Sequence, residues 1–162
     1  MSPTLDRPLR VLFLCTGNSA RSILGEFLLR QLGEGRFESL SAGAAPTGRV
    51  HPLALRTLAE TYGIDAAEAR SKSMTDVAEL EPDVVITVCD HARDTCPLWP
   101  GGALRVHWGL PDPAAVEGSE EERREAFERT AVVLHDRLVA LCSEAGADRD
   151  AGVFARAAEK LA

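Results

Sequence analysis

The hydrophobic positions of the chain follow two alternating patterns. Four short segments are predicted to be strands, and two of them, residues 9–14 and 84–88, are almost continuously apolar, which is typical of strands buried on both faces of a parallel sheet. The four segments are residues 9–14 (LRVLFL), 37–42, 84–88 (VVITV) and 104–107. Between and after them, apolar residues recur every three or four positions, which predicts amphipathic helices. We expect these helices at residues 23–33, 52–62 and 74–80, in a long segment opened by a capping box of Ser119 and Glu122, and within 145–162.

The order of these elements predicts the fold class. Strands that alternate with helices form right-handed βαβ units, so we expect an α/β protein with a small four-stranded parallel sheet, flavodoxin-like, with helices on both faces. All 162 residues are expected to form one domain with a loose leader (1–8), a catalytic core (9–144) and a C-terminal extension (145–162). Ligands of such folds bind beyond the carboxyl ends of the strands. Cys15 and Cys89 directly follow predicted strands and are expected at that edge.

Composition changes this picture only by exclusion. Of the 162 residues, 45% are hydrophobic and 27% are charged, as in globular proteins, and the formal net charge is −7. An acidic chain is a poor partner for nucleic-acid phosphates, so an anionic ligand must be attracted locally. No apolar run approaches the roughly 20 residues that span a bilayer, and residues 1–10 lack the apolar segment of a signal peptide. We expect a cytoplasmic protein with no membrane or nucleic-acid partner.

The strongest chemical signal is the segment CTGNSARS, residues 15–22, between the first strand and the first helix. A short loop at this position directs backbone N–H groups inward, and the helix N-terminus adds positive partial charge, so the two form an anion site. Cys15 is the candidate nucleophile because the same field favours its thiolate, and Arg21 is a bidentate donor for a tetrahedral oxyanion. The alternative is a buried structural cysteine before an ordinary turn. The remaining residues of this candidate oxyanion loop are Thr16, Gly17, Asn18, Ser19, Ala20 and Ser22.

Two further cysteines, Cys89 and Cys96, flank a polar segment in TVCDHARDTCP. A regular helix would hold their Cα atoms about 10.5 Å apart along its axis and an extended chain more than about 20 Å apart, whereas a disulfide needs about 5.5–6 Å. A redox pair here therefore requires the segment to change shape. Two alternatives remain open: the cysteines are unrelated, or Cys89, His91 and Cys96 bind zinc, although the spacing lacks a C-x2-C pair and a clear fourth ligand.

A candidate acid lies in the segment HWGLPDP, residues 107–113. A carboxyl group on a loop held by prolines can protonate a leaving oxygen, and Asp112 supplies that group. The alternative is a simple turn, because Pro-Asp-Pro is common in turns.

The segment CTGNSARS after LRVLFL resembles the active-site loop of the low-molecular-weight tyrosine phosphatase superfamily, which includes phosphatases and the thioredoxin-coupled arsenate reductases. The resemblance extends over residues 9–141 and implies a low-molecular-weight tyrosine phosphatase-like fold. It further implies that Cys15 is the nucleophile, that Arg21 binds the oxyanion, and that Asn18 and Ser22 support the loop.

Within this superfamily, the chain is more similar to the arsenate reductases. They carry a VTLC-like strand end, a second Cys-Pro seven residues later, and a general acid in an HWG…DPA stretch; the matching residues here are Cys89, Cys96 and Asp112. In the phosphatases an aromatic residue typically follows Asp-Pro, whereas this chain has Ala114 and Ala115. The resemblance implies reduction of arsenate to arsenite in arsenic detoxification, by a relay of three cysteines with thioredoxin as the reductant.

Three other functions remain open. A protein or small-molecule phosphatase would use only Cys15, Arg21 and Asp112. An arsenate reductase recycled by a low-molecular-weight thiol would replace thioredoxin with that thiol. A non-catalytic oxyanion sensor would use the loop to bind and the thiols to signal.

Some relatives of this superfamily bind a potassium ion beside the loop. Asn18, Glu26 and Ser41 resemble three of the ligands, but residues 71–76 (SKSMTD) offer no secure fourth carboxylate. The ion site is therefore left open, and no cofactor is expected.

The remaining noteworthy residues carry no assigned chemistry. Ala20 stands where some arsenate reductases have a further cysteine, and that cysteine is not part of the three-cysteine relay. Cys142 falls among the apolar residues of the long helix, so we expect it to pack as a small hydrophobic residue. His51 and His135 have no motif around them.

Overall fold

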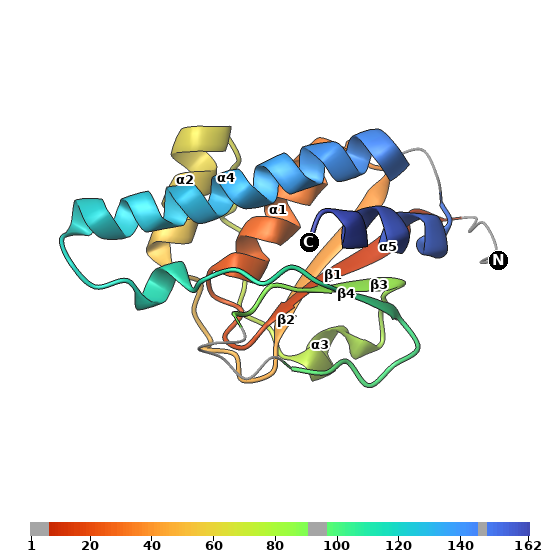
Figure 1. Ribbon diagram of the computed structural model, residues 1–162. Coiled ribbons are helices and arrows are strands. Elements are labelled where there is room, and N and C mark those ends of the chain that lie inside the picture. The colour runs from red at the N-terminus through yellow and green to blue at the C-terminus, as the bar shows by residue number, and fades with distance from the viewer. Residues whose placement is uncertain (1–6, 91–96, 146–148) are drawn as a thin grey trace.

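The computed structural model describes residues 7–90, 97–145 and 149–162. Figure 1 shows strands and helices alternating over the first half of the chain, except that two helices follow the second strand. Within the described residues, no helix is both long and apolar enough to cross a membrane. In chain order the elements are β1 (Leu9–Cys15), α1 (Arg21–Gly33), β2 (Phe37–Gly43), α2 (Pro52–Tyr62), α3 (Met74–Ala78), β3 (Val84–Thr87), β4 (Leu104–His107), the 3-10 turn η1 (Pro113–Ala115), α4 (Glu120–Ala145) and α5 (Ala151–Lys160).

The sheet consists of four parallel strands in the order β2-β1-β3-β4. Strand β1 pairs with β2 along its whole length, from Leu9 opposite Phe37 to Cys15 opposite Gly43. The α/β class and the four-stranded parallel sheet are thereby confirmed, and the predicted strand bounds hold to within one residue.

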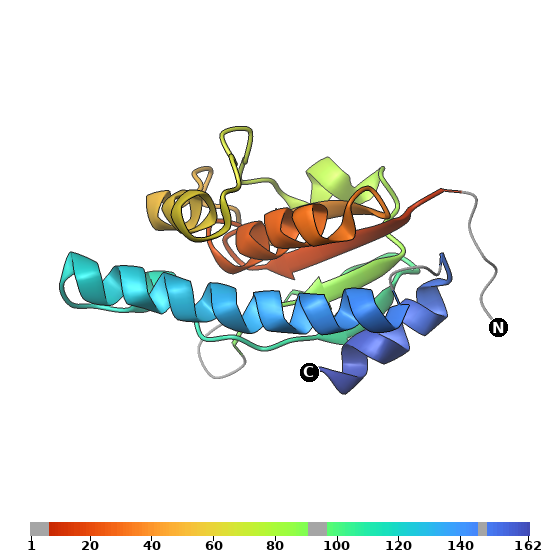
Figure 2. The same ribbon diagram turned by 90° about the horizontal axis from the view of Figure 1, so that it is seen from above.

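Alternate side chains of β1 enter two separate cores. Val11 and Phe13 belong to the core that includes α1, α4 and α5, whereas Leu12 and Leu14 pack with Val77 of α3 on the other face. Figures 1 and 2 show these layers, with α1 and α4 over one face of the sheet and α3 beyond the other. All four β1 side chains are fully buried, which explains why this strand is apolar without interruption. The expectation of helices on both faces is confirmed.

Close packing of α1 on β1 fixes the position of the loop between them. A Cβ atom at Gly25 would lie 2.6 Å from the Phe13 ring, so α1 can approach the strand this closely only with glycine at that position. The helix therefore starts directly above the carboxyl end of β1.

Helices α4 and α5 complete the larger core. The predicted capping box is present, since Glu122 N donates to Ser119 Oγ (3.1 Å) and Ser119 N donates to Glu122 Oε1 (3.4 Å). Helix α5 packs against α4 and β4. The indole Nε1 of Trp108 donates to Ala158 O (2.9 Å), and Phe154 is fully buried. The residues after α4 thus contribute to the core.

Candidate active site

The candidate nucleophile Cys15 ends β1 at the carboxyl edge of the sheet, and its side chain is buried. The backbone N–H of Asn18 donates to Cys15 Sγ at 3.2 Å, and Ser22 Oγ lies 2.9 Å from the same sulfur. Donors aimed at a buried sulfur suit an anionic thiolate, which is the nucleophilic form of cysteine. Ala20, the residue before α1, offers no side-chain cap to the start of the helix, where anions bind in phosphate-binding loops.

Asn18 holds the inside of the loop together. Its φ of 47° is in the left-handed region, which asparagine adopts more readily than most residues. Its side chain is fully buried and makes two hydrogen bonds: Nδ2 donates to Ser22 Oγ (2.8 Å), and Oδ1 accepts from Lys72 N (2.7 Å). Asn18 therefore connects the serine beside the nucleophile to a segment far along the chain.

The outside of the loop is braced by backbone hydrogen bonds from the segment after β2. Because the C=O and N–H of a trans peptide point in opposite directions, tying the loop carbonyls outward turns the following N–H groups toward the concave side. Ser71 Oγ adds a bond to Gly17 O (3.1 Å). The backbone bonds are Ala45 N to Thr16 O (2.9 Å), Thr47 N to Gly17 O (3.0 Å) and His51 N to Ser19 O (2.9 Å).

The structure brings Arg21 and Asp112 together beside this loop. The Arg21 side chain is 4% exposed; its Nη1 donates to Leu110 O (3.0 Å), and its Nη2 lies 3.8 Å from Asp112 Oδ2. The Asp112 side chain is 28% exposed, and its Oδ1 accepts from Ala114 N (3.0 Å), which caps η1. One carboxylate oxygen thus fixes the acid in its turn while the other is directed toward the arginine.

Cys89 follows β3 and reaches the same edge of the sheet as Cys15. Val88 N donates to Leu14 O (3.0 Å), so the neighbouring strands remain bonded up to their ends. Cys89 is fully buried and disulfide-bonded, whereas Cys15 and Cys142 are free.

The third thiol of the predicted relay, Cys96, and the zinc candidate His91 lie outside the described residues. In the part of the chain that the structure describes, no three His, Cys, Asp or Glu residues are grouped as metal ligands. Cys142 is half-buried against the larger core, and burial raises the pKa of its thiol, with Arg36 opposing. Its position agrees with the packing role expected of it.

The three residues that resemble potassium ligands do not all direct their oxygen atoms to one point. Glu26 and Ser41 contact each other through Ser41 Oγ and Glu26 Oε1, but Asn18 turns its amide oxygen to the backbone of Lys72. The Lys72 ammonium itself lies 3.6 Å from Glu26 Oε1 and 3.3 Å from Ser41 Oγ. Burial lowers the pKa of Lys72, and the Glu26 carboxylate opposes this effect.

Like Lys72, His51 lies near the loop and was not indicated by the sequence. Its Nδ1 accepts from Leu53 N (3.1 Å) and caps α2, while the centroid of its ring lies 4.6 Å from that of the Phe127 ring. Burial lowers the pKa of His51; Arg123 and Arg49 lower it further, and Asp112 opposes them. The available signal was Pro52 at the first helical position, which places the capping residue at 51.

The site combines a cysteine in a loop at the carboxyl edge of a parallel sheet, an arginine at the start of the following helix, and an aspartate beside that arginine. Together these features define a class of thiol enzymes that act on tetrahedral oxyanions. Residues 10–151 match the family of low molecular weight phosphotyrosine protein phosphatases, and the chain belongs to this family.

Its relatives include proteins named as arsenate reductases. The chain is 40% identical to the arsenate reductase of Halalkalibacterium halodurans over 128 residues, which cover 79% of this chain and 91% of that protein. The arsenate reductase structure from Archaeoglobus fulgidus has a TM-score of 0.68 at 27% identity, covering 83% of this chain and 99% of the other. A thioredoxin-dependent arsenate reductase of Corynebacterium glutamicum has a TM-score of 0.57 at 30% identity, covering 82% of this chain and 63% of the other.

Proposed function

We propose that this protein is an arsenate reductase in which Cys15 attacks arsenate held in the loop of residues 15–22. One observation carries the proposal: two cysteines lie at the ends of adjacent strands, at one edge of the sheet. Cys15 is free and its sulfur accepts from a backbone N–H, whereas Cys89 is disulfide-bonded. A phosphatase needs only the first of these thiols. The relatives named as arsenate reductases support the choice of substrate.

Binding of arsenate uses local charge, since the whole molecule is acidic. The inward N–H groups of the loop and the start of α1 meet the arsenate oxygens, and the planar guanidinium of Arg21 pairs with two of them. The contacts of this guanidinium with Leu110 O and Asp112 hold it beside the loop, where it can meet the substrate.

The first chemical step forms a sulfur–arsenic bond. The Cys15 thiolate attacks arsenic(V) and one arsenic–oxygen bond breaks, while Asp112 gives its proton to the departing hydroxyl, which leaves as water. Ser22 and Asn18 hold the sulfur in line through their contacts with it.

The second step transfers two electrons. The Cys89 thiolate attacks Cys15 Sγ, the sulfur–arsenic bond breaks, and its electron pair stays on arsenic, which leaves as arsenite. Cys96 then attacks Cys89, which frees Cys15 and leaves a Cys89–Cys96 disulfide. Both exchanges conserve electrons, because one arsenate is reduced for each disulfide formed.

Thioredoxin is proposed to reduce that disulfide. The thioredoxin-dependent relative supports this partner. Because Cys89 is fully buried in the disulfide-bonded state, the incoming thiolate is expected to attack the sulfur of Cys96.

The test is steady-state NADPH oxidation with arsenate, thioredoxin and thioredoxin reductase, compared with recycling by glutathione or mycothiol. We expect arsenate-dependent turnover with thioredoxin, and none with Cys15→Ser. Faster turnover with a low-molecular-weight thiol would reject thioredoxin as the reductant. Hydrolysis of p-nitrophenyl phosphate without arsenate-dependent NADPH oxidation under any condition would make the protein a phosphatase.

A further inference from the structure

The least expected group near the loop is the ammonium of Lys72. Lys72 is one of only two lysines in a chain that otherwise uses arginine for positive charge, and the other is Lys160. The side chain of Lys72 is 17% exposed and that of Glu26 is 8% exposed, so the pair lies largely out of water. A lysine is rarely buried unless it is paired, which calls for a reason specific to this position.

Three oxygen atoms surround the ammonium. Lys72 Nζ lies 2.6 Å from Arg70 O, 3.3 Å from Ser41 Oγ and 3.6 Å from Glu26 Oε1. An ammonium group has three donors and no acceptor, so it can form the two hydrogen bonds to Arg70 O and Ser41 Oγ and still direct a donor toward the Glu26 carboxylate. The second carboxylate oxygen of Glu26 accepts from Arg30 Nη2 at 2.9 Å. Glu26 is therefore paired on both oxygens.

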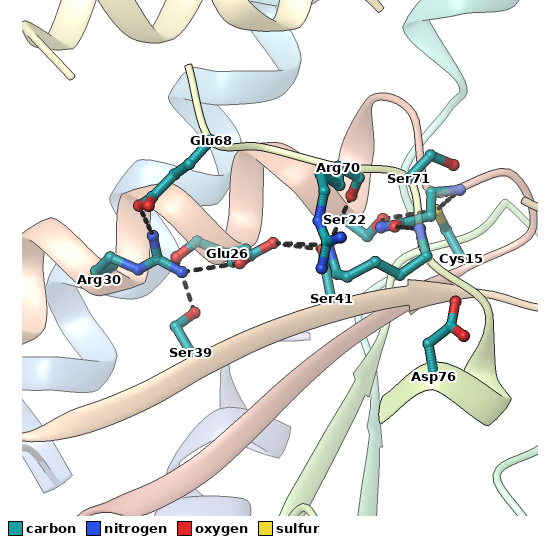
Figure 3. Close-up of polar contacts among 12 residues, drawn as sticks. Cys15, Ser22, Glu26, Arg30, Ser39, Ser41, Glu68, Arg70, Ser71 and Asp76 are labelled. Carbon is teal, nitrogen blue, oxygen red and sulfur yellow. Dashed lines mark hydrogen bonds and ion pairs between the residues drawn. The ribbon is translucent and has the colours of Figure 1, made fainter. Parts of the chain in front are cut away.

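These contacts continue to the nucleophile. The backbone N–H of Lys72 donates to Asn18 Oδ1, Asn18 Nδ2 donates to Ser22 Oγ, and Ser22 Oγ contacts Cys15 Sγ. Figure 3 shows this succession of polar contacts running from Arg30 and Glu26 to Ser22 and Cys15. Lys72 thus contacts the buried Glu26 carboxylate with its side chain and the oxyanion loop with its backbone N–H.

The residues present do not fit a potassium ion. Glu26 Oε1 and Ser41 Oγ, two of the oxygen atoms that would bind it, already face a positive charge, and Asn18 Oδ1 accepts from a backbone N–H. An ion at this position would meet the like charge of Lys72 in a poorly solvated site.

We propose that the Lys72 ammonium serves as a built-in monovalent cation, which neutralises Glu26 beneath the oxyanion loop and makes the loop independent of potassium. Lysine suits this role better than arginine, because its charge is compact and its three donors can turn toward separate oxygens. Lys72 is a positioning residue: it acts on Cys15 through Glu26 and Asn18.

Two variants at this position separate the charge from the space it fills. Lys72→Ala removes the charge and leaves room for an ion beside Glu26 and Ser41, whereas Lys72→Met removes the charge and fills the space. Lys160→Ala, at an exposed position, is the matched control. Thermal unfolding and iodoacetamide alkylation of Cys15 are measured on reduced protein, in potassium chloride and in tetramethylammonium chloride of equal ionic strength. Neither measurement needs arsenate turnover, so failure here is distinguishable from failure of the proposed function.

The wild type and Lys160→Ala are expected to give the same Tm and the same alkylation profile in both salts. In tetramethylammonium, both Lys72 variants should lose about 5 °C or more in Tm, because a buried carboxylate loses a partner. Alkylation of Cys15 at about pH 6 should slow by at least about threefold, because a nearby positive charge is lost. Potassium should restore Lys72→Ala and leave Lys72→Met unchanged.

Specific stabilisation of the wild type by potassium would overturn the proposal, because an ion would then bind alongside Lys72. An alkylation profile of Lys72→Ala in tetramethylammonium equal to that of the wild type would also overturn it, since the lysine would then only fill space. If the single variants fold poorly, Lys72→Met combined with Glu26→Gln should be more stable than Lys72→Met alone. A double variant that is less stable would contradict the pairing of the two charges.

Discussion

The side chain of Asn18 combines conformation and chemistry in one residue. Its left-handed φ turns the loop, its backbone N–H reaches Cys15 Sγ, and its amide holds Ser22 beside the same sulfur. The nucleophile is therefore positioned by a neighbour three residues away.

Asp112 can be tested by a variant that keeps its turn. Asp112→Asn retains an oxygen that can accept from Ala114 N, but it cannot give a proton. We expect the rate of disulfide formation after arsenate addition to fall about 10²–10⁴-fold, the usual contribution of general acid catalysis. Protection of Cys15 by phosphate against alkylation should remain. An unchanged rate across the pH range would leave Asp112 as a turn residue only.

His51 predicts a pH dependence of stability. Because burial and the nearby arginines lower its pKa in the folded protein, protonation favours the unfolded state. Its contribution is complete above the ordinary value of about 6.5 and is lost as the pH falls through the lowered pKa of the folded state. Protonation of Nδ1 also removes the cap of α2, which is worth about 1 kcal/mol in typical helices.

The comparison is with His51→Asn, which keeps a capping side chain that does not titrate. Urea unfolding is measured between about pH 7.5 and pH 5. The wild type should lose more stability than the variant over this range. Parallel losses in the two proteins would exclude His51 as the titrating group.

At the scale of elements, the carboxyl end of β2 contacts the oxyanion loop and limits where its backbone can lie. A Cβ atom at Gly43 would lie 2.5 Å from Thr16 O and 2.9 Å from Asn18 N. Gly43→Ala should therefore displace the loop, lower the free energy of unfolding by about 1–3 kcal/mol, and reduce the reactivity of Cys15. Gly102→Ala is the control, because a Cβ atom there meets nothing within 4 Å. Equal alkylation of Cys15 in wild type and Gly43→Ala would show that the loop tolerates the change.

The sequence was sufficient for the strands and helices because their burial leaves a periodic pattern, and for the proximity of Cys15 and Arg21 because both lie in one contiguous loop. A turn at Pro-Asp-Pro was only an alternative, and the 3-10 helix η1 was not predicted, since three residues carry no periodicity. Lys72 and His51 were missed for another reason: their contacts with Glu26 and Phe127 depend on how distant elements pack. A lysine in an arginine-rich chain was only a faint signal.

At the scale of the whole molecule, the strand order determines which thiols can meet. Strands β1 and β3 are far apart in the sequence but adjacent and parallel in the sheet, so Cys15 and Cys89 leave it at the same edge. The proposed relay therefore depends on topology more than on any local motif.

Cys89→Ser separates the two chemistries that this edge supports. Hydrolysis of p-nitrophenyl phosphate needs Cys15 and an acid, so it should persist within about a factor of two, while multiple-turnover arsenate reduction should disappear. Cys142→Ser is the control, because that free thiol lies in α4 away from the edge. Equal loss of both activities would show that the variant is misfolded or that the roles are wrongly divided.

The most direct test of the account is a single turnover. Reduced protein is mixed with arsenate without any external reductant, quenched with an alkylating agent, and analysed for arsenite and for disulfide-linked peptides. We expect one arsenite per protein molecule, a Cys89–Cys96 disulfide, and Cys15 recovered as an alkylated thiol. Arsenite release with Cys15–Cys89 as the stable product, and Cys96 still free, would contradict the three-cysteine relay; no arsenite at all would contradict the proposed function.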